Sequence, residues 1–447
     1  MLKIAIIADD LTGANDCAVR LTAKGCRPFI MIRPVDGADA SSFPSAAVTG
    51  GGPSVDARFP QLVIDTDSRA SRAEEAYAKV KEAAEFVKRS GFSFVYKKID
   101  STFRGNTGRE IDALYDVYRP DFVVIAPAYP KHGRQVMDGK LYMHGLPLHE
   151  TEIARDPKTP VTISDIPALL RSQTTRSVGL LTRSELHEAD FRLNDRLSRF
   201  RSENTPYLVF DSLDDDDLRR IVEGVNNSGY SVVWAGSAGL IGQLPAEEGN
   251  DEEIRLAVTH GEATILVVVG SVSPRSRKQL EVLLRQPDVL PLEMRSHVLA
   301  VGQRSGKREM ERVLRKAEAL HARFRTIVLY TTGHPEDVRL AQAAGRNCGL
   351  DHKKTSDNIA AALGETVAAL RQFVPVGGYV LTGGDTARQV CDRIGAEWME
   401  IVGEVEEGIP IGRLSVGGVA AVTKAGSFGS DDALWNAVRT LRGEVLV

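Results

Sequence analysis

The 447-residue sequence has few cysteines, little excess charge and no long apolar run. Its four cysteines, at positions 17, 26, 348 and 391, form no C-x-x-C pair and have no His at metal-ligand spacing, so we expect reduced thiols in a cytoplasmic protein. Lys and Arg number 56 against 60 Asp and Glu, and this balance excludes a general basic field for nucleic acid or acidic lipid. The start, MLKIAIIADD, is unlike a signal peptide, and no apolar run approaches the roughly 18 residues of a membrane span.

Several catalytic signatures are also missing. The sequence contains no G-x-x-x-x-G-K-[ST] loop, no G-x-G-x-x-G fingerprint and no H-R-D kinase loop. The string GSAG at 236–239 lacks the G-x-S-x-G spacing of a nucleophile elbow, so we interpret it as a turn that opens a helix. These absences argue against a P-loop enzyme, a serine hydrolase and a dinucleotide-dependent dehydrogenase.

Short apolar runs alternate with helical patterns along most of the chain. A single core stops growing near roughly 250–300 residues, so two domains are expected. Strands are predicted at 3–8, 61–64, 92–99, 122–126, 178–181, 207–210, 231–234, 264–269, 326–330 and 379–381. Helices of 10–15 residues separate many of them, and Ser71 with Glu74 forms an apparent capping box for one helix. This alternation predicts doubly wound, parallel sheets.

The domain boundary is predicted in the acidic segment PAEEGNDEE at 245–253, which gives domains at 1–244 and 254–447. The expected class is α/β with two domains, each a largely parallel sheet flanked by helices, and an active-site cleft between them. Two further segments look irregular. Residues 36–60 are rich in Gly, Ser, Ala and Pro and predict a surface loop, whereas residues 130–160 are basic, and a loop of that length is usually functional.

Polar residues follow four strands of the first half, at the carboxyl ends where ligands of open α/β sheets bind, and we expect these four strand ends to be adjacent. Carboxylates accept hydrogen bonds from hydroxyls and Arg clasps a carboxylate, so this set suits a polyhydroxylated anion. Helix capping by Asp9 and Asp10 and a surface pair between Asp100 and Arg104 are the alternatives. The candidate residues are Asp9, Asp10, Asp67, Ser68, Arg69, Lys97, Asp100, Arg104, Gly105 and Arg134.

The second half has Gly-, Ser- and Thr-rich turns at its strand ends. They are GSVSP at 270–274, TGGDT at 382–386 and TKAGSFGS at 423–430. Such turns let a phosphate approach backbone N–H groups, so they predict a nucleotide site, although glycine is also ordinary in strand–helix turns. The candidates are Ser271, Ser273, Gly383, Gly384, Asp385, Thr386, Gly426, Ser427 and Gly429.

Together these strings resemble the four-carbon acid sugar kinase family. The resemblance rests on ADDLTGA at 8–14, DTDSR at 65–69, KKIDSTFRGN at 97–106, PAYPKHGR at 127–134 and the three turns above. It implies an N-terminal domain for the sugar acid, a C-terminal domain for ATP, and phosphorylation of the terminal C4 hydroxyl. DTDSR and KKIDSTFRGN are similar to the D-threonate kinase branch, while D-erythronate and 3-oxo-tetronate stay open as substrates.

The expected mechanism uses ATP and Mg²⁺, with no metal ligand assigned beyond Asp385 as a candidate. Asp10 and Asp100 are the candidate catalytic residues, with Asp10 preferred as the base, and closure of the domains is expected to bring the ligands together. The substrate carboxylate is assigned to Arg69, Arg104 or Arg134, with Lys97 as a further candidate. The rival interpretation from another class is a small-anion binding protein without catalysis. The oligomeric state stays open.

Overall fold

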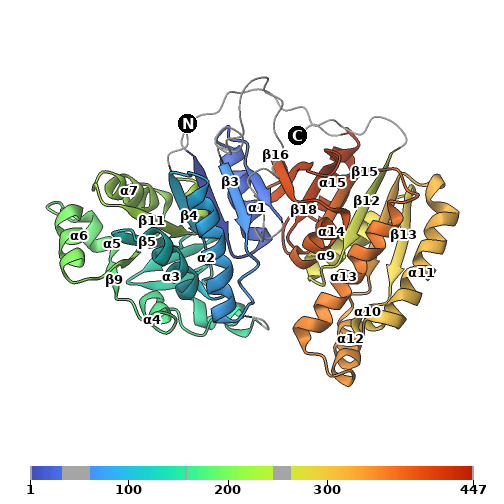
Figure 1. Ribbon diagram of the computed structural model, residues 1–447, viewed down its shortest axis with the longest axis horizontal. Coiled ribbons are helices and arrows are strands. Elements are labelled where there is room, and N and C mark those ends of the chain that lie inside the picture. Colours follow the sequence, from blue (N-terminus) through green and yellow to red (C-terminus); the bar gives the residue numbers. More distant parts are fainter. Residues whose placement is uncertain (1–2, 33–60, 157–158, 245–262, 445–447) are drawn as a thin grey trace. The chain divides into compact units, whose positions relative to one another are not determined.

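The computed structural model describes residues 3–32, 61–156, 159–244 and 263–444. The chain divides into two compact units, Met1–Asn250 and Asp251–Val447, and each unit holds a sheet flanked by helices (Figure 1). The predicted linker at 245–253 and the predicted loop at 36–60 lie outside the described residues, so the domain limits of 1–244 and 254–447 stay predictions. Among the described residues, no helix is both long and apolar enough to cross a membrane.

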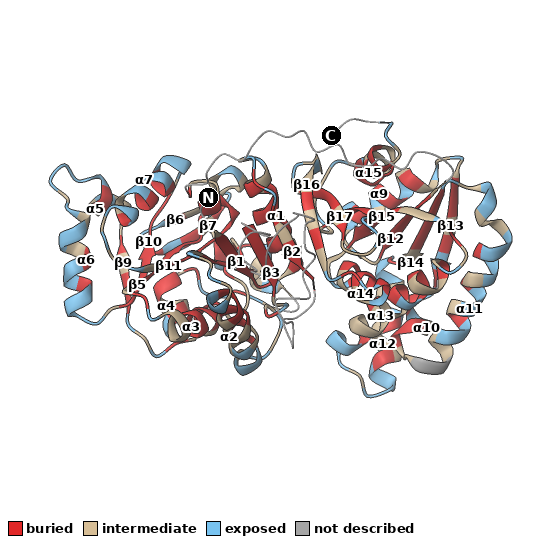
Figure 2. Cartoon of the chain, turned by 45° about the horizontal axis from the view of Figure 1, so that its top comes forward, coloured by how far each residue is buried: buried red, intermediate tan, exposed pale blue. Residues whose placement is uncertain are grey.

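The first unit contains a parallel sheet with the strand order β2-β3-β1-β4-β11-β5-β10-β9. Its strands are β1 (Ile4–Ala8), β2 (Phe29–Met31), β3 (Gln61–Asp65), β4 (Phe94–Lys98), β5 (Phe122–Ala126), β9 (Val178–Leu181), β10 (Tyr207–Phe210) and β11 (Val232–Gly236). Its helices are α1 (Leu11–Thr22), α2 (Ala73–Arg89), α3 (Thr107–Tyr118), α4 (Ile166–Arg171), α5 (Arg183–His187), α6 (Leu193–Ser202), α7 (Asp215–Asn226) and α8 (Ala238–Ile241). The strands are nearly continuous apolar runs because helices cover both faces, so their residues are buried while the exposed residues lie on the helices (Figure 2).

A three-stranded antiparallel sheet occupies part of the segment predicted to be irregular. It consists of β6 (Arg134–Met137), β7 (Lys140–Met143) and β8 (Leu146–Pro147). Asp138 and Gly139 connect the first two strands with φ of 51° and 71°, as a tight hairpin turn requires. The carboxylate of Asp211 accepts hydrogen bonds from both of these N–H groups, at 2.8 and 2.9 Å. The Asp-Gly pair was therefore a hairpin signal that the compositional interpretation missed.

The second unit contains a mixed sheet with the order β13-β14-β12-β15-β18-β17-β16. Its strands are β12 (Thr264–Val269), β13 (Val289–Met294), β14 (Thr326–Thr331), β15 (Val376–Thr382), β16 (Trp398–Glu406), β17 (Ile409–Leu414) and β18 (Ala420–Lys424). Its helices are α9 (Pro274–Leu284), α10 (Ser296–Ala300), α11 (Gln303–Leu320), α12 (Pro335–Asn347), α13 (His352–Leu370), α14 (Gly384–Ile394) and α15 (Ala433–Leu441). The first five strands in this order, β13, β14, β12, β15 and β18, run parallel to one another. Strand β17 pairs antiparallel with β18 and with β16.

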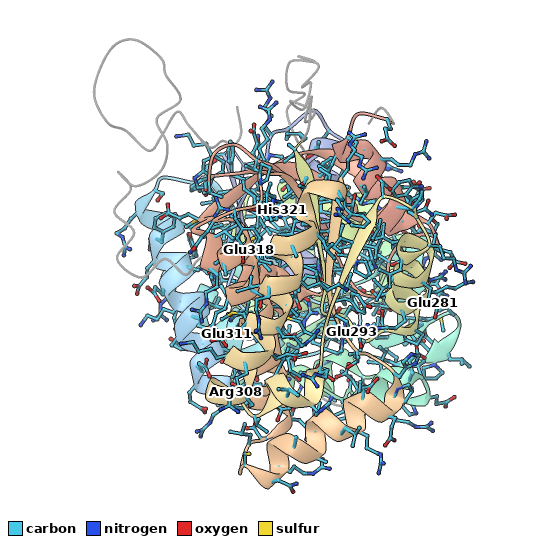
Figure 3. The ribbon with its side chains drawn as sticks, turned by 90° about the vertical axis from the view of Figure 1, so that its right-hand side faces the viewer. Glu281, Glu293, Arg308, Glu311, Glu318 and His321 are labelled. Atoms are coloured by element: carbon cyan, nitrogen blue, oxygen red, sulfur yellow. The ribbon has the colours of Figure 1, made fainter. Side chains whose placement is uncertain are left out.

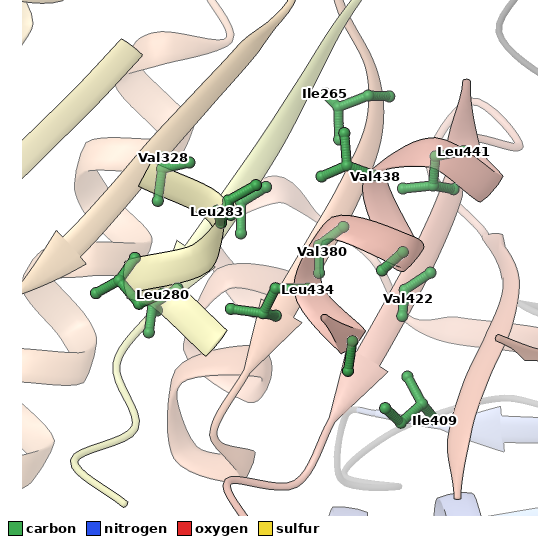
Figure 4. Close-up of a cluster of buried hydrophobic side chains, with 14 of the residues drawn as sticks. Ile265, Leu280, Leu283, Val328, Val380, Ile409, Val422, Leu434, Val438 and Leu441 are labelled. Atoms are coloured by element: carbon green, nitrogen blue, oxygen red, sulfur yellow. The ribbon is translucent and has the colours of Figure 1, made fainter. Parts of the chain in front are cut away.

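Apolar helix faces cover the second sheet. Leu280 and Leu283 of α9 and Leu434 of α15 pack with Val380 and Val422 of the sheet in one buried cluster (Figure 4). Helix α11 shows the same division of its surface, because Val313 and Ala317 are buried whereas Arg308, Glu311 and Glu318 are exposed (Figure 3). This pattern is the usual one for a helix that lies on a sheet.

The predicted α/β class with two largely parallel sheets is confirmed. Pro274 is the first residue of α9, as its position predicts. The predicted capping box at Ser71 and Glu74 is wrong, because Arg72 precedes α2 and makes no side-chain cap. The Ser71 hydroxyl instead donates to the Asp67 carbonyl at 3.3 Å.

Candidate functional site

The carboxyl ends of β3, β1 and β4 lie next to one another in the first sheet. Strand β1 pairs with β3 on one side and β4 on the other, and all three are parallel. The chain leaves β1 toward β3 and later returns to β4, so this is the switch point where open α/β sheets bind ligands. One part of the prediction needs correction: β11 lies between β4 and β5, so the loop that carries Arg134 starts from a strand that is not adjacent to β4.

Arg69 joins the two aspartates that follow β1. Its guanidinium donates to both oxygens of Asp9, at 2.8 and 2.9 Å, and to both oxygens of Asp10, at 2.5 and 2.8 Å. Asp10 also caps α1, because its Oδ1 accepts the Gly13 N–H at 2.7 Å. Asp10 therefore both caps a helix and belongs to the site, so the two alternatives predicted for it, helix capping and chemistry at the site, do not exclude each other.

The two aspartates have opposite pKa shifts. Burial acts to raise the pKa of the Asp9 carboxyl, but the charges of Arg69 and Lys97 outweigh it and hold this pKa below its usual range. Burial raises the pKa of Asp10, and the neighbouring Asp9 charge adds to the rise, although Arg69 opposes it. The side chain of Asp10 is 24% exposed against 4% for Asp9. Asp10 is thus the more basic and the more accessible of the two.

Asp100, at the end of β4, is held as a carboxylate. Arg104 Nε donates to it at 2.6 Å, and the Thr102 hydroxyl donates to the same oxygen. Burial acts to raise the pKa of Asp100, but Arg69 and Arg104 hold it far below its ordinary value. Arg104 also pairs with Asp156 at 3.1 Å, so its fork is shared between two carboxylates.

Gly105 allows the backbone of this loop to pass close to Arg69. Its φ of +94° is unfavourable for other residues. A Cβ at this position would lie 3.0 Å from both the Cγ and the carbonyl oxygen of Arg69. The glycine therefore brings the loop after β4 against the loop after β3, and it acts through the backbone.

Arg134 differs from the other two arginines of the site. Within the described part of the chain it forms no ion pair with a carboxylate, although its Nη1 donates to the His132 carbonyl. Its Nε is buried and has no hydrogen-bond partner there. Burial lowers the pKa of this guanidinium, the charges of Asp100 and Glu152 oppose the shift, and the charge of Arg104 adds to it.

Three residues that were predicted to bind the substrate either lie exposed to solvent or already have a partner inside the fold. Lys97 is fully buried, and its ammonium pairs with Glu110 of α3 at 2.9 Å, so it is a counter-ion inside the fold. The buried Ser68 hydroxyl shares a hydrogen bond with Thr66 at 2.8 Å. Asp67 is exposed, at a φ of 47°. The structure brings the other predicted residues of this unit together.

The sequence interpretation missed Lys98. Successive residues of a strand point to opposite faces, so Lys97 faces α3 whereas Lys98 faces α1. A Cβ on Gly13 would lie 2.9 Å from both the Lys98 ammonium and the Asp10 Oδ1. Burial acts to lower the pKa of Lys98, but the neighbouring Cys17 and Asp9, followed by Asp16 and Asp10, outweigh it and raise this pKa. The charge of Lys98 therefore offsets both aspartates, whereas Lys97 acts on Asp9 from the other face of the strand.

Asp16, one turn after Gly13 on α1, is a second missed group. Burial raises the pKa of its carboxyl to about 6, with Asp10 contributing and Lys98 opposing the rise. The strand phase and the helical spacing of i+3 from Gly13 are the signals that could have pointed to Lys98 and Asp16.

The second unit brings its three predicted turns together at neighbouring strand ends. Val269 of β12 pairs with Thr382 of β15, and Thr382 pairs with Lys424 of β18. The Ser273 hydroxyl donates to the Gly426 carbonyl at 2.6 Å, and a Cβ on Gly426 would collide with the Ser271 hydroxyl. Within this unit, all nine predicted nucleotide-binding residues belong to these three turns.

Two helices begin at these turns. Ser273 is the N-cap of α9, and Gly383, at a φ of +99°, precedes α14. The first N–H groups of a helix and its dipole favour an anion such as phosphate. Among the described residues there is no group of three or more His, Cys, Asp or Glu that could hold a metal ion. Asp385 supplies a carboxylate in the first turn of α14, which suits a Mg²⁺ that arrives with nucleotide phosphates.

Two family models match the chain, one in each of its two units. Residues 4–244 match the family model of a sugar-binding N-terminal domain, and residues 266–434 match that of a nucleotide-binding C-terminal domain. The chain belongs to the four-carbon acid sugar kinase family.

Its relatives share a chemistry but differ in substrate. A D-threonate kinase of Salmonella typhimurium is 32% identical, over 98% of both chains. A D-erythronate kinase of Heliobacterium modesticaldum is 31% identical, over 97% of this chain and 95% of its own, and a 3-oxo-tetronate kinase of Pseudomonas savastanoi is 28% identical over 98% and 97%. These relatives support a kinase of four-carbon acid sugars with ATP as the phosphate donor, and they do not select one substrate.

Solved structures agree on the fold. A Salmonella typhimurium crystal structure has a TM-score of 0.76 over 98% of this chain and 100% of its own. A Haemophilus influenzae protein of family DUF1537 has a TM-score of 0.71 over 97% and 98%. Both are 24% identical to this chain, so this likeness concerns the architecture alone.

Proposed function

We propose that this kinase phosphorylates the C4 hydroxyl of D-threonate to give 4-phospho-D-threonate. The observation that carries the proposal is the arginine-bridged aspartate pair at the switch point, beside the Asp100 and Arg104 pair. The aspartate oxygens, which can accept hydrogen bonds from several substrate hydroxyls, then lie close to arginines that can bind the single substrate carboxylate. The strings DTDSR and KKIDSTFRGN, which are similar to the D-threonate kinase branch, favour D-threonate, and D-erythronate is the second candidate.

Arg134 is our choice for the substrate carboxylate. Arg69 is shared by Asp9 and Asp10, and Arg104 is shared by two further carboxylates. Among the described arginines of this site, Arg134 alone keeps a buried, unpartnered Nε and no ion pair. A partly buried guanidinium with an unpartnered Nε is costly, and a bound carboxylate offsets that cost.

Asp10 is our choice for the base. Its pKa is raised by burial, and a base with a higher pKa accepts a proton from a hydroxyl more readily. Asp100 is the weaker candidate because its arginine neighbours hold its pKa low. Asp9 and Asp100 then accept hydrogen bonds from the other hydroxyls. Arg69 and Lys98 offset the negative charge of the aspartates.

ATP binds the three turns of the second unit, with its phosphates against the N-termini of α9 and α14. Mg²⁺ neutralises phosphate charge when it is bound, and Asp385 would hold it on the protein side. Ser271 and Thr386 offer hydroxyls to the phosphates, while Gly384, Gly426, Ser427 and Gly429 offer backbone N–H groups. The Ser273 hydroxyl and the Gly383 N–H instead shape the site, because they already donate to the carbonyls of Gly426 and Lys424. Phosphoryl transfer depends mainly on positioning and on neutralising charge, which these residues supply.

A substrate panel tests the proposal. The intact chain is mixed with ATP, Mg²⁺ and one of D-threonate, L-threonate, D-erythronate or 3-oxo-tetronate, and the product is identified by mass spectrometry with its phosphate position. We expect the highest kcat/KM with D-threonate and a C4 phosphate. A preference for D-erythronate would replace the substrate and keep the reaction, whereas acid binding without ADP release would favour the binding-protein rival.

A further inference from the structure

Lys424, the last residue of β18, uses its whole ammonium on the loop that follows it. Its Nζ donates to the carbonyl oxygens of Ala425 at 2.7 Å, Gly426 at 3.2 Å and Phe428 at 3.0 Å. The residue is 3% exposed. An ammonium has three N–H donors and no acceptor, so the loop occupies all of them. Lys424 has no donor left for a phosphate.

The geometry of the peptide unit connects these carbonyls to the predicted phosphate ligands. In a trans peptide the C=O of one residue and the N–H of the next point in opposite directions, and the described chain has no cis peptide. The carbonyls of Ala425, Gly426 and Phe428 therefore share peptide planes with the N–H groups of Gly426, Ser427 and Gly429. Within the described residues, these same three N–H groups have no hydrogen-bond acceptor.

Other bonds hold the same carbonyls in place. The Gly426 carbonyl also accepts from the hydroxyls of Ser273 and Ser276, at 2.6 and 2.8 Å. The Phe428 carbonyl also accepts from Gln279 Nε2 at 3.0 Å. The loop is thus fixed on its carbonyl side, and its N–H side is left for another partner.

We propose that Lys424 is a positioning residue of the nucleotide site, which turns the N–H groups of Gly426, Ser427 and Gly429 toward the phosphates of ATP. This inference rests on the proposed function, because it takes the partner of the loop to be a nucleotide. It differs from the role of a P-loop lysine, which contacts the phosphates directly. Here the cation acts through three peptide units that it orients.

The environment of Lys424 makes this arrangement dependent on pH. Burial lowers the pKa of Lys424 to about 8. The charged groups that act on it are Glu406 of β16, which opposes the shift, and Arg275 of α9, which adds to it. Arg275 is itself paired with Asp431 at 2.8 Å. As the pH rises through about 8 the ammonium loses one donor, so ATP binding weakens with rising pH.

The experiment measures the affinity of the intact chain and of Lys424→Met for two ligands by calorimetric titration. The ligands are ATP, in the presence of Mg²⁺, and adenosine. Lys278→Met is the matched control, because Lys278 is exposed on α9 and pairs with Asp431, so it removes an equal charge near the loop. We expect Lys424→Met to weaken ATP binding by at least about 10-fold, since three charge-assisted bonds orient the loop. The adenosine affinity of Lys424→Met and the ATP affinity of Lys278→Met should both stay within twofold of the values for the unmodified chain.

Unchanged ATP affinity in Lys424→Met, or an equal loss of ATP and adenosine, would overturn the proposal. If Lys424→Met does not fold, the pH profile of the unmodified chain decides. ATP affinity should fall between pH 7 and pH 9.5 while adenosine affinity stays level, and a flat ATP profile contradicts the role of Lys424. Absence of ATP binding by the unmodified chain would instead refute the nucleotide site itself.

Discussion

Asp10 combines a structural and a chemical contribution in one carboxylate. Its Oδ1 accepts the Gly13 N–H as the cap of α1, while Arg69 bonds both of its oxygens. An amide at this position can still accept the capping bond. Asp10→Asn therefore removes the charge and the basicity without removing the cap, and its effects on catalysis and on stability can be separated.

We predict that Asp10→Asn lowers kcat by about 100-fold or more, the usual contribution of a general base, and leaves ATP affinity unchanged. Steady-state kinetics with D-threonate and titration of ATP measure the two effects. Asp214→Asn is the matched control, because Asp214 caps α7 in the same way, accepting the Asp217 N–H at 2.9 Å. Turnover close to that of the unmodified chain would remove Asp10 from the role of base.

Arg134 and Arg104 should respond differently to truncation. Arg134→Met removes a cation without a carboxylate partner and should cost about 2 kcal/mol of substrate binding, a roughly 30-fold rise in the KM for D-threonate. Its melting temperature should be preserved. Arg104→Met leaves the buried Asp100 without its partner, so it should lower both the melting temperature and the activity.

The readouts are KM for each substrate and the melting temperature of each variant. The KM for ATP is the internal control, and it should not change in either variant. A rise in the KM for D-threonate with Arg104→Met at an unchanged melting temperature, together with no effect of Arg134→Met, would transfer the carboxylate to Arg104.

Strand β4 shows how an element separates structural from site lysines. Lys97 pairs with Glu110 of α3 inside the fold, whereas Lys98 lies on the α1 side, beside Gly13. Two adjacent lysines at a strand end look equivalent in the sequence. Only the phase of the strand decides which one faces the site.

We predict that Lys97→Met destabilises the chain by about 3–5 kcal/mol, since it leaves the buried Glu110 without a partner. The double variant Lys97→Met with Glu110→Leu should recover most of that loss, because an apolar pair of similar volume is often neutral. Urea unfolding followed by tryptophan fluorescence measures both. Arg339→Met is the exposed control, since the Arg339–Glu336 pair lies on the surface and should matter little.

The same double variant tests the function of Lys97. If Lys97 is only a counter-ion, the double variant should bind D-threonate normally once its stability is restored. If the double variant is as stable as the unmodified chain but has lost its affinity for D-threonate, Lys97 must be assigned to the substrate site.

For the molecule as a whole, the sequence predicted the strand ends better than their order. Asp9, Asp10, Arg69 and Asp100 follow predicted strands, and their contacts follow from the adjacency of β3, β1 and β4. The insertion of β11 between β4 and β5 could not be predicted, because strand order depends on long-range pairing that local patterns do not encode.

Side-chain pairing was the other feature beyond the sequence. Three arginines, with Lys97 as a further candidate, looked available for the acid, yet Arg69 pairs with Asp9 and Asp10 of the site and Lys97 pairs with Glu110 inside the fold. The missed hairpin of β6 and β7 has a local signal, Asp138-Gly139, so that failure came from weighing composition above turn chemistry. Residue types were thus predictable, and their partners required coordinates.

Two separate ligand sites predict two separate patterns of protection in hydrogen exchange. A ligand at 100 times its Kd stabilises the state that binds it by about 2.7 kcal/mol, which slows exchange through local opening by up to about 100-fold. D-threonate should therefore protect peptides that cover 8–14, 65–69 and 97–106, and ATP should protect those that cover 270–274, 382–386 and 423–430. Exchange followed by mass spectrometry on the intact chain measures both, with peptides of 193–202 in α6 as the internal control. Protection of the second set by D-threonate alone would contradict this division of ligands, because the acid would then bind at the turns that we give to the nucleotide.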